Sequence, residues 1–524
     1  MAVRGLLKKG QYLDSVSLMT LSRKILQLPN VTDCAAVLGT TENRAILEKS
    51  GLFVREFQQS SDTDLLIAIN IGREDKPDQV IALVETILLD LSKPKATAGE
   101  PDPSSIESAS SRLEGANLIL ISVAGRYAAD LAMKALHTGL HVMLFSDNVS
   151  LESEIKLKKY AIERGLMVMG PDCGTAIING IPLAFANAVN RGDIGIVAAS
   201  GTGLQEVSCL ISNNGAGISQ AIGTGGRDVK KEIGGLMFLE GLRLLSQDPI
   251  TKVILLVSKP PDREVLIKIA EAARRITKPI VQLFQGGDPN LLESLNIFAA
   301  STLEEGALLA VALSCGKDPK SINEDLISRD LGLAEIARKE AVRMADSQIY
   351  VRGLFSGGTF CSEAQLIMKT AGLNVFSNVP IPGANKLLDV FKNHEHTMID
   401  FGVDEFTVGR PHPMIDFSLR TKRLLEEARD DRTSVILFDL VLGYGANEDP
   451  LPEILPAIIQ ARDITRQAGR NLSLICSVTG TLKDPQDRAA IIIGLEKAGV
   501  RIGESNAAAC KLAGLIAKFR MKQL

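Results

Sequence analysis

Short apolar segments alternate with helical segments over most of this chain, most regularly from Asn117 onward. In the first regular series the apolar runs fall at 117–123, 141–145 and 166–169, and a second series occupies 194–284. Short strands separated by helical segments of roughly ten to fifteen residues are typical of βαβ units and a parallel sheet. The pattern therefore predicts an α/β fold.

The chain is too long for a single hydrophobic core, so we expect several domains. It has 524 residues, whereas a domain usually has about 100–200. A stretch rich in proline, serine and charge cannot bury enough apolar surface to order itself, and it marks the first boundary. The expected parts are an N-terminal α/β lobe at 1–92, a linker at 93–112, a Rossmann-like domain at 113–191, an α/β domain at 192–315, a connector of paired helices at 316–346 and a last α/β domain at 347–524.

The last two domains share a glycine-rich turn between a strand and a helix, which indicates an internal duplication. The start of a helix leaves unpaired N–H groups and a partial positive charge, and glycine lets an anion come close to them. We expect two such turns to bind one phosphate from opposite sides: Ser200, Gly201, Thr202 and Gly203 in the first, and Ser356, Gly357, Gly358 and Thr359 in the second. The alternative is that each serine only caps its helix.

A second glycine-rich segment follows the strand expected at 217–222. It carries Gly225, Gly226, Arg227 and Asp228. Open α/β sheets bind their ligands at the carboxyl ends of the strands, and an arginine is always charged. We therefore expect the two glycines and Asp228 to contact substrate or phosphate, and Arg227 to stabilise an oxyanion in catalysis. The alternative is a flexible turn with an Arg–Asp pair on the surface.

The segment 409–416 combines two prolines with arginine, histidine and aspartate. Proline fixes the backbone, while arginine and histidine supply anion binding and proton transfer. We predict that Arg410 and His412 are catalytic, Arg410 as an oxyanion ligand and His412 as an acid/base or phosphate ligand. The alternative for His412 is a structural hydrogen bond to the backbone.

Composition excludes several classes of function. The net charge is -4 and the pI is near 5.9, so no basic field attracts nucleic acid or an anionic membrane surface. The seven cysteines are scattered without C-x-x-C spacing, which argues against a disulfide framework and a zinc site. Without an apolar signal or spanning segment, we expect a cytoplasmic protein. No Walker A motif, H-E-x-x-H or G-x-S-x-G is present.

These motifs together resemble the FdrA family, whose domains are similar to those of succinyl-CoA synthetase. The resemblance covers nearly the whole chain and rests on the segments 14–19, 145–149, 169–175, 199–203, 225–228 and 409–416. It implies a CoA-binding-type domain at 113–191, followed by flavodoxin-like α-type and β-type ligase domains at 192–315 and 347–524. It also implies a phosphate site between two helix N-termini, companion subunits and a homo- or hetero-oligomer.

Two features of succinyl-CoA synthetase are missing. The stretch that would carry its phosphate-relay histidine reads Gln-Gly-Gly-Asp-Pro at 285–289, and the β-type part begins directly at its ligase half, without an ATP-grasp domain. Family relatives of the allantoin (purine) pathway transfer a carbamoyl group from oxalurate to phosphate. We therefore expect a subunit of a carbamoyl or acyl transferase that uses phosphate as substrate, with no certain cofactor and CoA as an option. The alternatives are an acyl-CoA synthetase and a non-catalytic scaffold.

Overall fold

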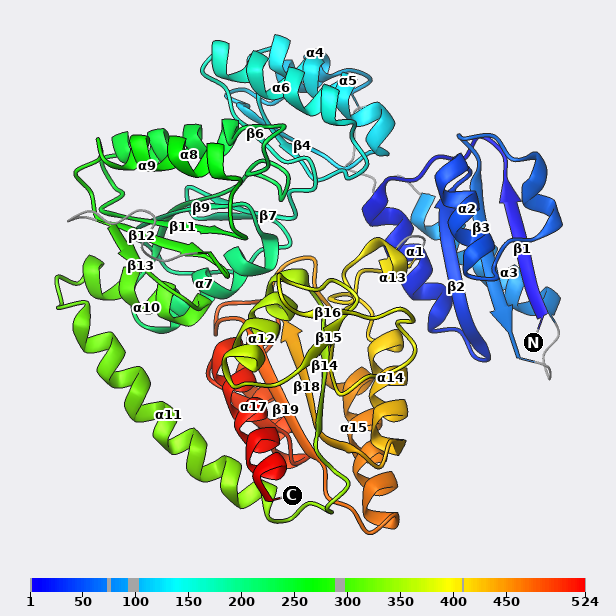
Figure 1. The fold of residues 1–524 in the computed structure, drawn as a ribbon. Helices are drawn as coiled ribbons and strands as arrows, with labels where there is room; N and C mark the ends of the chain where they lie inside the picture. Colours follow the sequence, from blue (N-terminus) through cyan, green and yellow to red (C-terminus); the bar gives the residue numbers. More distant parts are fainter. Residues whose placement is uncertain (1, 73–76, 93–102, 288–296, 408–409, 524) are drawn as a thin grey trace.

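The computed structural model describes residues 2–72, 77–92, 103–287, 297–407 and 410–523. These residues form four β-sheets with helices packed around them (Figure 1). The fold is a multidomain α/β arrangement with parallel sheets and a small N-terminal lobe, as predicted. Parts of three predicted segments lie outside the described residues. They are 93–102 of the linker, 288–289 of the stretch that would carry the relay histidine, and Gly409 of the segment 409–416.

The N-terminal lobe is a three-stranded antiparallel sheet in the order β1-β3-β2. Its elements are β1 (Ala2–Lys8), α1 (Ser15–Leu26), β2 (Val31–Leu38), α2 (Thr41–Lys49), the 3-10 helix η1 (Arg55–Gln59), β3 (Leu65–Ile71) and α3 (Pro77–Ser92). Leu21, Ile25 and Val84 from α1 and α3 pack on one face of the sheet. Leu47 and Phe57, from α2 and η1, pack on the other. The central strand β3 is therefore buried on both faces.

A three-stranded parallel sheet follows the lobe, in the order β4-β5-β6. Its elements are α4 (Ile106–Arg112), β4 (Leu118–Ile121), α5 (Gly125–His137), β5 (His141–Leu144), α6 (Leu151–Glu163) and β6 (Val168–Met169). The strands lie within the apolar runs of the sequence. β6 and most of β5 are buried, whereas in β4 only Ile121 is buried, Leu118 and Ile119 are partly buried, and Leu120 is exposed.

The third sheet has seven strands in the order β13-β12-β11-β9-β10-β7-β8. Its elements are β7 (Thr175–Ile178), β8 (Ile181–Ala184), β9 (Arg191–Ala198), α7 (Gly201–Asn213), β10 (Ile218–Gly223), α8 (Leu236–Gln247), β11 (Val253–Ser258), α9 (Arg263–Ala273), β12 (Ile280–Phe284), β13 (Ile297–Ala299) and α10 (Leu303–Ser314). The five strands β9 to β13 are parallel, and β7 and β8 add an antiparallel hairpin. The sequence predicts residues 175–184 as part of the Rossmann-like domain at 113–191, but the hairpin that they form pairs with β10 of the third sheet.

The fourth sheet also has seven strands, in the order β16-β15-β17-β14-β18-β19-β20, and all of them are parallel. Its elements are β14 (Tyr350–Phe355), α12 (Gly358–Thr370), β15 (Val375–Ser377), β16 (Asn385–Lys386), β17 (His396–Asp400), α13 (Asp404–Thr407), α14 (Ser418–Arg429), β18 (Thr433–Val441), α15 (Leu451–Gln467), β19 (Ser473–Thr479), α16 (Arg488–Lys497), β20 (Arg501–Gly503) and α17 (Asn506–Gln523). The order β17-β14-β18-β19-β20 repeats β10-β9-β11-β12-β13. This repetition supports the predicted internal duplication.

The third and fourth sheets share one hydrophobic core, to which α7, α10, α12 and α17 all contribute. The buried Glu363 of α12 accepts hydrogen bonds from Leu303 N at the start of α10 and from Asn506 Nδ2 at the start of α17. Burial raises the pKa of Glu363 to about 7. A single helix, α11 (Lys320–Ala341), runs along the outside and joins the two halves (Figure 1). The pair of helices expected at 316–346 is thus one helix of 22 residues.

Candidate functional site

The first predicted turn lies at the end of β9, the central strand of its sheet. Ser200 is the N-cap of α7, and its Oγ accepts a hydrogen bond from Gly203 N at 3.1 Å. In a sheet of this strand order, the start of the helix after the central strand lies where the order reverses, which is where ligands bind. The fold therefore places the Ser200 turn at the expected edge.

The second turn lies at the end of β14 and is built differently. Ser356 does not cap α12, because its N and Oγ both donate to the buried carboxylate of Asp439. Burial raises the pKa of Asp439, and the nearby Arg420 opposes that rise. The N-cap of α12 is Gly357, which offers no side-chain hydrogen bond. The first-turn N–H groups of α12 consequently have no side-chain cap and are available to an anion.

The two turns meet directly. Ser200 Oγ and Thr359 Oγ1 are 2.5 Å apart and share a hydrogen bond. A Cβ built on Gly357 would lie 2.5 Å from Thr202 Cγ2, so a side chain there would force the turns apart. Two helix starts that face each other bring two partial positive charges together, an arrangement that an anion between them would stabilise. The structure thus brings the two predicted turns into one site.

His412 joins this site from the loop after α13. A Cβ built on Gly402 would lie 3.4 Å from His412 Nε2 and 2.9 Å from Ser356 O, so the imidazole lies close to the second turn. His412 Nδ1 accepts a hydrogen bond from Met414 N at 3.2 Å. Burial, with a smaller effect of Arg420, lowers the pKa of His412 to about 4. At neutral pH the ring is uncharged and carries its proton on Nε2, so it can donate a hydrogen bond.

Two further residues, Asp400 and Lys259, lie beside the second turn. A Cβ built on Gly358 would lie 2.9 Å from Asp400 Oδ2 and 3.8 Å from Lys259 Nζ. Burial raises the pKa of Asp400 to about 6. Lys259 directly follows β11, and its place after a buried strand was the signal that could have identified it.

The segment around Arg227 is held by contacts within the fold. Arg227 Nη2 donates to Val149 O at 2.8 Å and pairs with Glu154 Oε2 at 2.9 Å. The buried Asp228 accepts hydrogen bonds from Lys158 Nζ and from the backbone at the start of α8. Gly225 has a φ of +81° and packs against Pro171 O, while Gly226 faces Ala199 O. These contacts tie the segment to α6 and α8, and the predicted ligand contacts of Gly225, Gly226, Arg227 and Asp228 stay predictions.

Arg410 lies two residues before His412 but its guanidinium faces the N-terminal lobe. Its Nε and Nη2 donate to the two carboxylate oxygens of Asp33, at 3.1 and 2.6 Å. The guanidinium of Arg410 is therefore already paired, through two hydrogen bonds, with a carboxylate of the protein. The structure thus brings His412, but not the Arg410 guanidinium, to the two turns.

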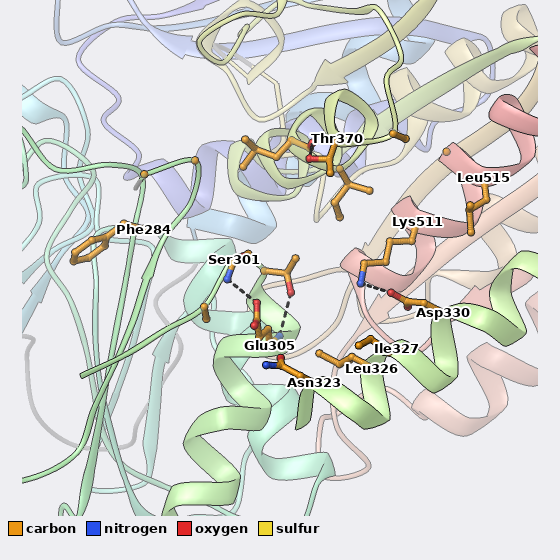
Figure 2. Close-up of a pocket in the computed structure, with 18 of the residues that line it drawn as sticks. Phe284, Ser301, Glu305, Asn323, Leu326, Ile327, Asp330, Thr370, Lys511 and Leu515 are labelled. Carbon is orange, nitrogen blue, oxygen red and sulfur yellow. Dashed lines mark hydrogen bonds and ion pairs between the residues drawn. The ribbon is translucent and has the colours of Figure 1, made fainter. Parts of the chain in front are cut away.

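A cavity of about 880 Å³ lies elsewhere, between α11, α12, α17 and the β12–β13 edge (Figure 2). Its walls are largely apolar, and Lys511 pairs with Asp330 across it at 2.6 Å. None of the residues of the two turns lines this cavity. Geometry and charge therefore point to the turns, rather than to this cavity, as the place where an anion would bind.

The described part of the chain lacks two further kinds of feature. Within it, no group of three or more His, Cys, Asp and Glu side chains could hold a metal ion. No helix in the same ranges combines the length and apolar character needed to cross a membrane.

Comparison with known proteins agrees with this fold. Family models match residues 354–516 (CoA-ligase), residues 189–286 (CoA binding domain) and residues 1–103 (AllF, heavy metal-associated domain). These matches indicate a succinyl-CoA synthetase-like protein, with one region similar to CoA-ligases and another similar to CoA binding domains. More particularly, the chain belongs to the family of the uncharacterized protein YahF of Escherichia coli (strain K12), to which it is 43% identical over 481 residues, 92% of each chain.

Two ligase subunits are more distant relatives. Subunit alpha 2 of the ADP-forming succinate–CoA ligase of Archaeoglobus fulgidus is 30% identical over 175 residues, 33% of this chain and 59% of that subunit. The malate–CoA ligase subunit alpha of Methylorubrum extorquens is 29% identical over 183 residues, 33% of this chain and 60% of that subunit. The CoA-binding match at 189–286 falls after 113–191, where we had expected the CoA-binding-type domain. The domain boundaries remain predictions.

Proposed function

We propose that the protein transfers an acyl group between a CoA thioester and phosphate, as a subunit of a succinyl-CoA ligase-like enzyme. The observation that carries this proposal is the meeting of the α7 and α12 starts through Ser200 and Thr359. The matches to CoA-ligase and CoA-binding models support a CoA thioester as the acyl donor. The start of α12, which has no side-chain cap, supports phosphate as the acceptor. The domain organisation, the site residues and a role for companion subunits or an oligomer belong to the same proposal.

Phosphate would replace the Ser200–Thr359 contact with hydrogen bonds from both hydroxyls and from the first-turn N–H groups of α12. Lys259 would add positive charge, and the Nε2–H of His412 would donate to an oxyanion. A phosphate oxygen attacks the thioester carbonyl carbon, the C–S bond breaks, and the sulfur leaves as thiolate, which takes up a proton. The products are an acyl phosphate and CoA.

The distribution of histidines supports direct transfer to phosphate rather than a phosphohistidine relay. The chain has five histidines, and the stretch from His141 to His394 contains no other. His396 is buried, and its Nδ1 accepts a hydrogen bond from Val351 N. His412 Nδ1 is engaged by Met414 N. Phosphate bound at the two turns would thus be a substrate.

A second candidate keeps the site and changes the donor. In carbamoyl transfer, a phosphate oxygen attacks the carbamoyl carbon of a ureido acid such as oxalurate, the C–N bond breaks, and the leaving nitrogen takes a proton. Oxamate and carbamoyl phosphate result. The missing relay histidine agrees with this reaction as it does with acyl transfer, because neither reaction needs phosphoryl transfer to a nucleotide. The resemblance of the sequence to the FdrA family supports carbamoyl transfer.

Parallel assays separate the candidates. The full chain, with any subunits that copurify, would be incubated with phosphate and either acyl-CoA thioesters or oxalurate, and free thiol and trapped acyl or carbamoyl phosphate would be measured. Ser200→Ala should abolish turnover. Ser150→Ala is the matched control, because Ser150 caps α6 in the same way, accepting from Ser153 N at 3.2 Å. If neither donor turns over with the copurified subunits present, the scaffold alternative replaces both reactions.

A further inference from the structure

The N-terminal lobe matches a model named for a heavy metal-associated domain, yet its residues do not fit a metal ion. Residues 1–103 contain one cysteine, Cys34, and no histidine. Cys34 is fully buried, and burial raises the pKa of its thiol, which opposes the thiolate that metals prefer. The contacts of the lobe indicate another role.

The first contact is a two-point ion pair with the loop that carries His412. Asp33, on β2, holds the Arg410 guanidinium through both oxygens, at 3.1 and 2.6 Å. The Asp33 side chain is 28% exposed and that of Arg410 is 16% exposed, so solvent screens the pair only in part. The two residues are 377 positions apart in the chain.

A second contact reaches the same loop through Asn447. Arg23 of α1 donates to Asn447 Oδ1 at 3.3 Å and pairs with Glu453 at 3.2 Å. Asn447 in turn bonds the backbone of the loop: its N donates to Met414 O and its Nδ2 to Ile415 O, both at 2.9 Å. The lobe therefore contacts the segment 410–416 directly at its beginning, through Arg410, and indirectly near its end, through Asn447.

We propose that the N-terminal lobe is a positioning module: Asp33 and Arg23 hold the loop 410–416 so that His412 Nε2 lies beside the start of α12. This inference assigns Arg410 to an anchor within the protein instead of a ligand of the substrate. The anchor can be tested independently of the proposed function, because the position of the loop can be measured without turnover.

Asp33→Asn tests the anchor. Asparagine keeps the size of the side chain and the acceptor for Cys34 N, but it loses the charge that pairs with Arg410. Hydrogen–deuterium exchange of the amides at 410–416 should rise by about three- to tenfold. The NMR titration of the His412 ring should move toward that of an exposed histidine. Arg410→Gln, which breaks the same pair from the other side, should give the same two changes.

Asp62→Asn is the matched control. Asp62 is also on the lobe, but it pairs with Arg126 of α5 and not with the loop. It should leave exchange at 410–416 and the His412 titration as in the wild type. Zn²⁺ alone, titrated calorimetrically into the full chain and into Cys34→Ala, should show no stoichiometric site that depends on Cys34.

Three outcomes would overturn the proposal. In the first, Asp33→Asn and Arg410→Gln both behave like Asp62→Asn. In the second, the wild type has a stoichiometric Zn²⁺ site that is lost in Cys34→Ala, and in the third, amide exchange of the loop rises equally in all three charge variants. A wild-type chain that is inactive with every donor, yet shows the loop effect, would remove the proposed function and leave the anchor intact.

Discussion

Ser200 and Thr359 lie 159 positions apart in the chain, and their hydroxyl groups share a hydrogen bond of 2.5 Å. Each residue belongs to the first turn of a helix that follows the central strand of its sheet. The two halves of the duplication thus face each other through equivalent turns. Two of the predictions below concern the surroundings of this contact, and two concern buried groups elsewhere in the fold.

Gly357→Ala should separate the two turns. Its Cβ would lie 2.5 Å from Thr202 Cγ2, so the variant should lose about 1–3 kcal/mol of unfolding free energy and bind phosphate more weakly. Gly332→Ala is the control, because Gly332 lies in α11 with nothing within 4 Å of the added carbon. That change should stabilise by up to about 1 kcal/mol. Denaturant unfolding and calorimetric phosphate titration measure both effects, and equal behaviour of the two variants would argue against a tight junction.

Anion binding should strengthen as the pH falls through about 6. Burial raises the pKa of Asp400 to about 6, so its carboxylate beside α12 is charged above that pH and repels an anion, and it is neutral below. Sulfate is a suitable probe, since its charge is constant in this range. Asp400→Asn should remove the pH dependence. Asp172→Asn should retain it, although burial also raises the pKa of Asp172 to about 6, because among the described residues Asp172 has no hydrogen bond to either turn.

Protonation of His396 should lower the free energy of unfolding of the protein in mild acid. Its folded-state pKa, lowered to about 4 by burial and by Arg352, lies below the value of about 6.5 for an unfolded histidine. The neutral ring therefore contributes stability above pH 6.5, and that contribution is lost as the pH falls toward 4. Between pH 7 and pH 5 the loss is about 2 kcal/mol. His396→Gln should show a correspondingly smaller drop in unfolding free energy, and an identical drop would contradict the assignment.

Gln285→Met should stabilise the fold or leave it unchanged. The Gln285 amide is 5% exposed, and neither its Nε2 nor its Oε1 has a hydrogen-bond partner among the described residues. A buried polar group without a partner costs about 1–3 kcal/mol, which a methionine of similar size avoids. Gln348→Met is the contrast, since its buried amide bonds Thr433 O and Asn471 O and accepts from Ala345 N. It should destabilise by about 2 kcal/mol or more. Thermal unfolding decides, and a loss of stability in Gln285→Met would show that the amide has a partner.

Much of the architecture follows from local sequence. The apolar runs at 117–123 and 141–145 were recognisable as strands because they are short, apolar and separated by helical segments. The two glycine-rich turns could be predicted because glycine between a strand and a helix has a local physical cause. The hairpin of β7 and β8 was missed, although Asn179 and Gly180, with φ of 52° and 80°, are a recognisable turn signal.

The remaining features depend on contacts between distant segments. The partner of the Arg410 guanidinium cannot be predicted from the local sequence, because an arginine can pair with a substrate or with a carboxylate of the protein. The packing of the lobe against the loop brings Asp33 to it. Lys259 and Asp400 come together beside Gly358 from different sheets. Periodicity within one segment has no information about such encounters. The position of His412 beside the second turn likewise depends on the folded loop.

The long helix α11 has a consequence for assembly. The ligase relatives matched by this chain are named as separate alpha subunits, whereas here one polypeptide carries both facing turns on either side of α11. Covalent linkage makes their encounter intramolecular, at an effective concentration that dilution does not lower. Synthesis also supplies the two half-sites in strict one-to-one proportion, so a cell cannot make one without the other.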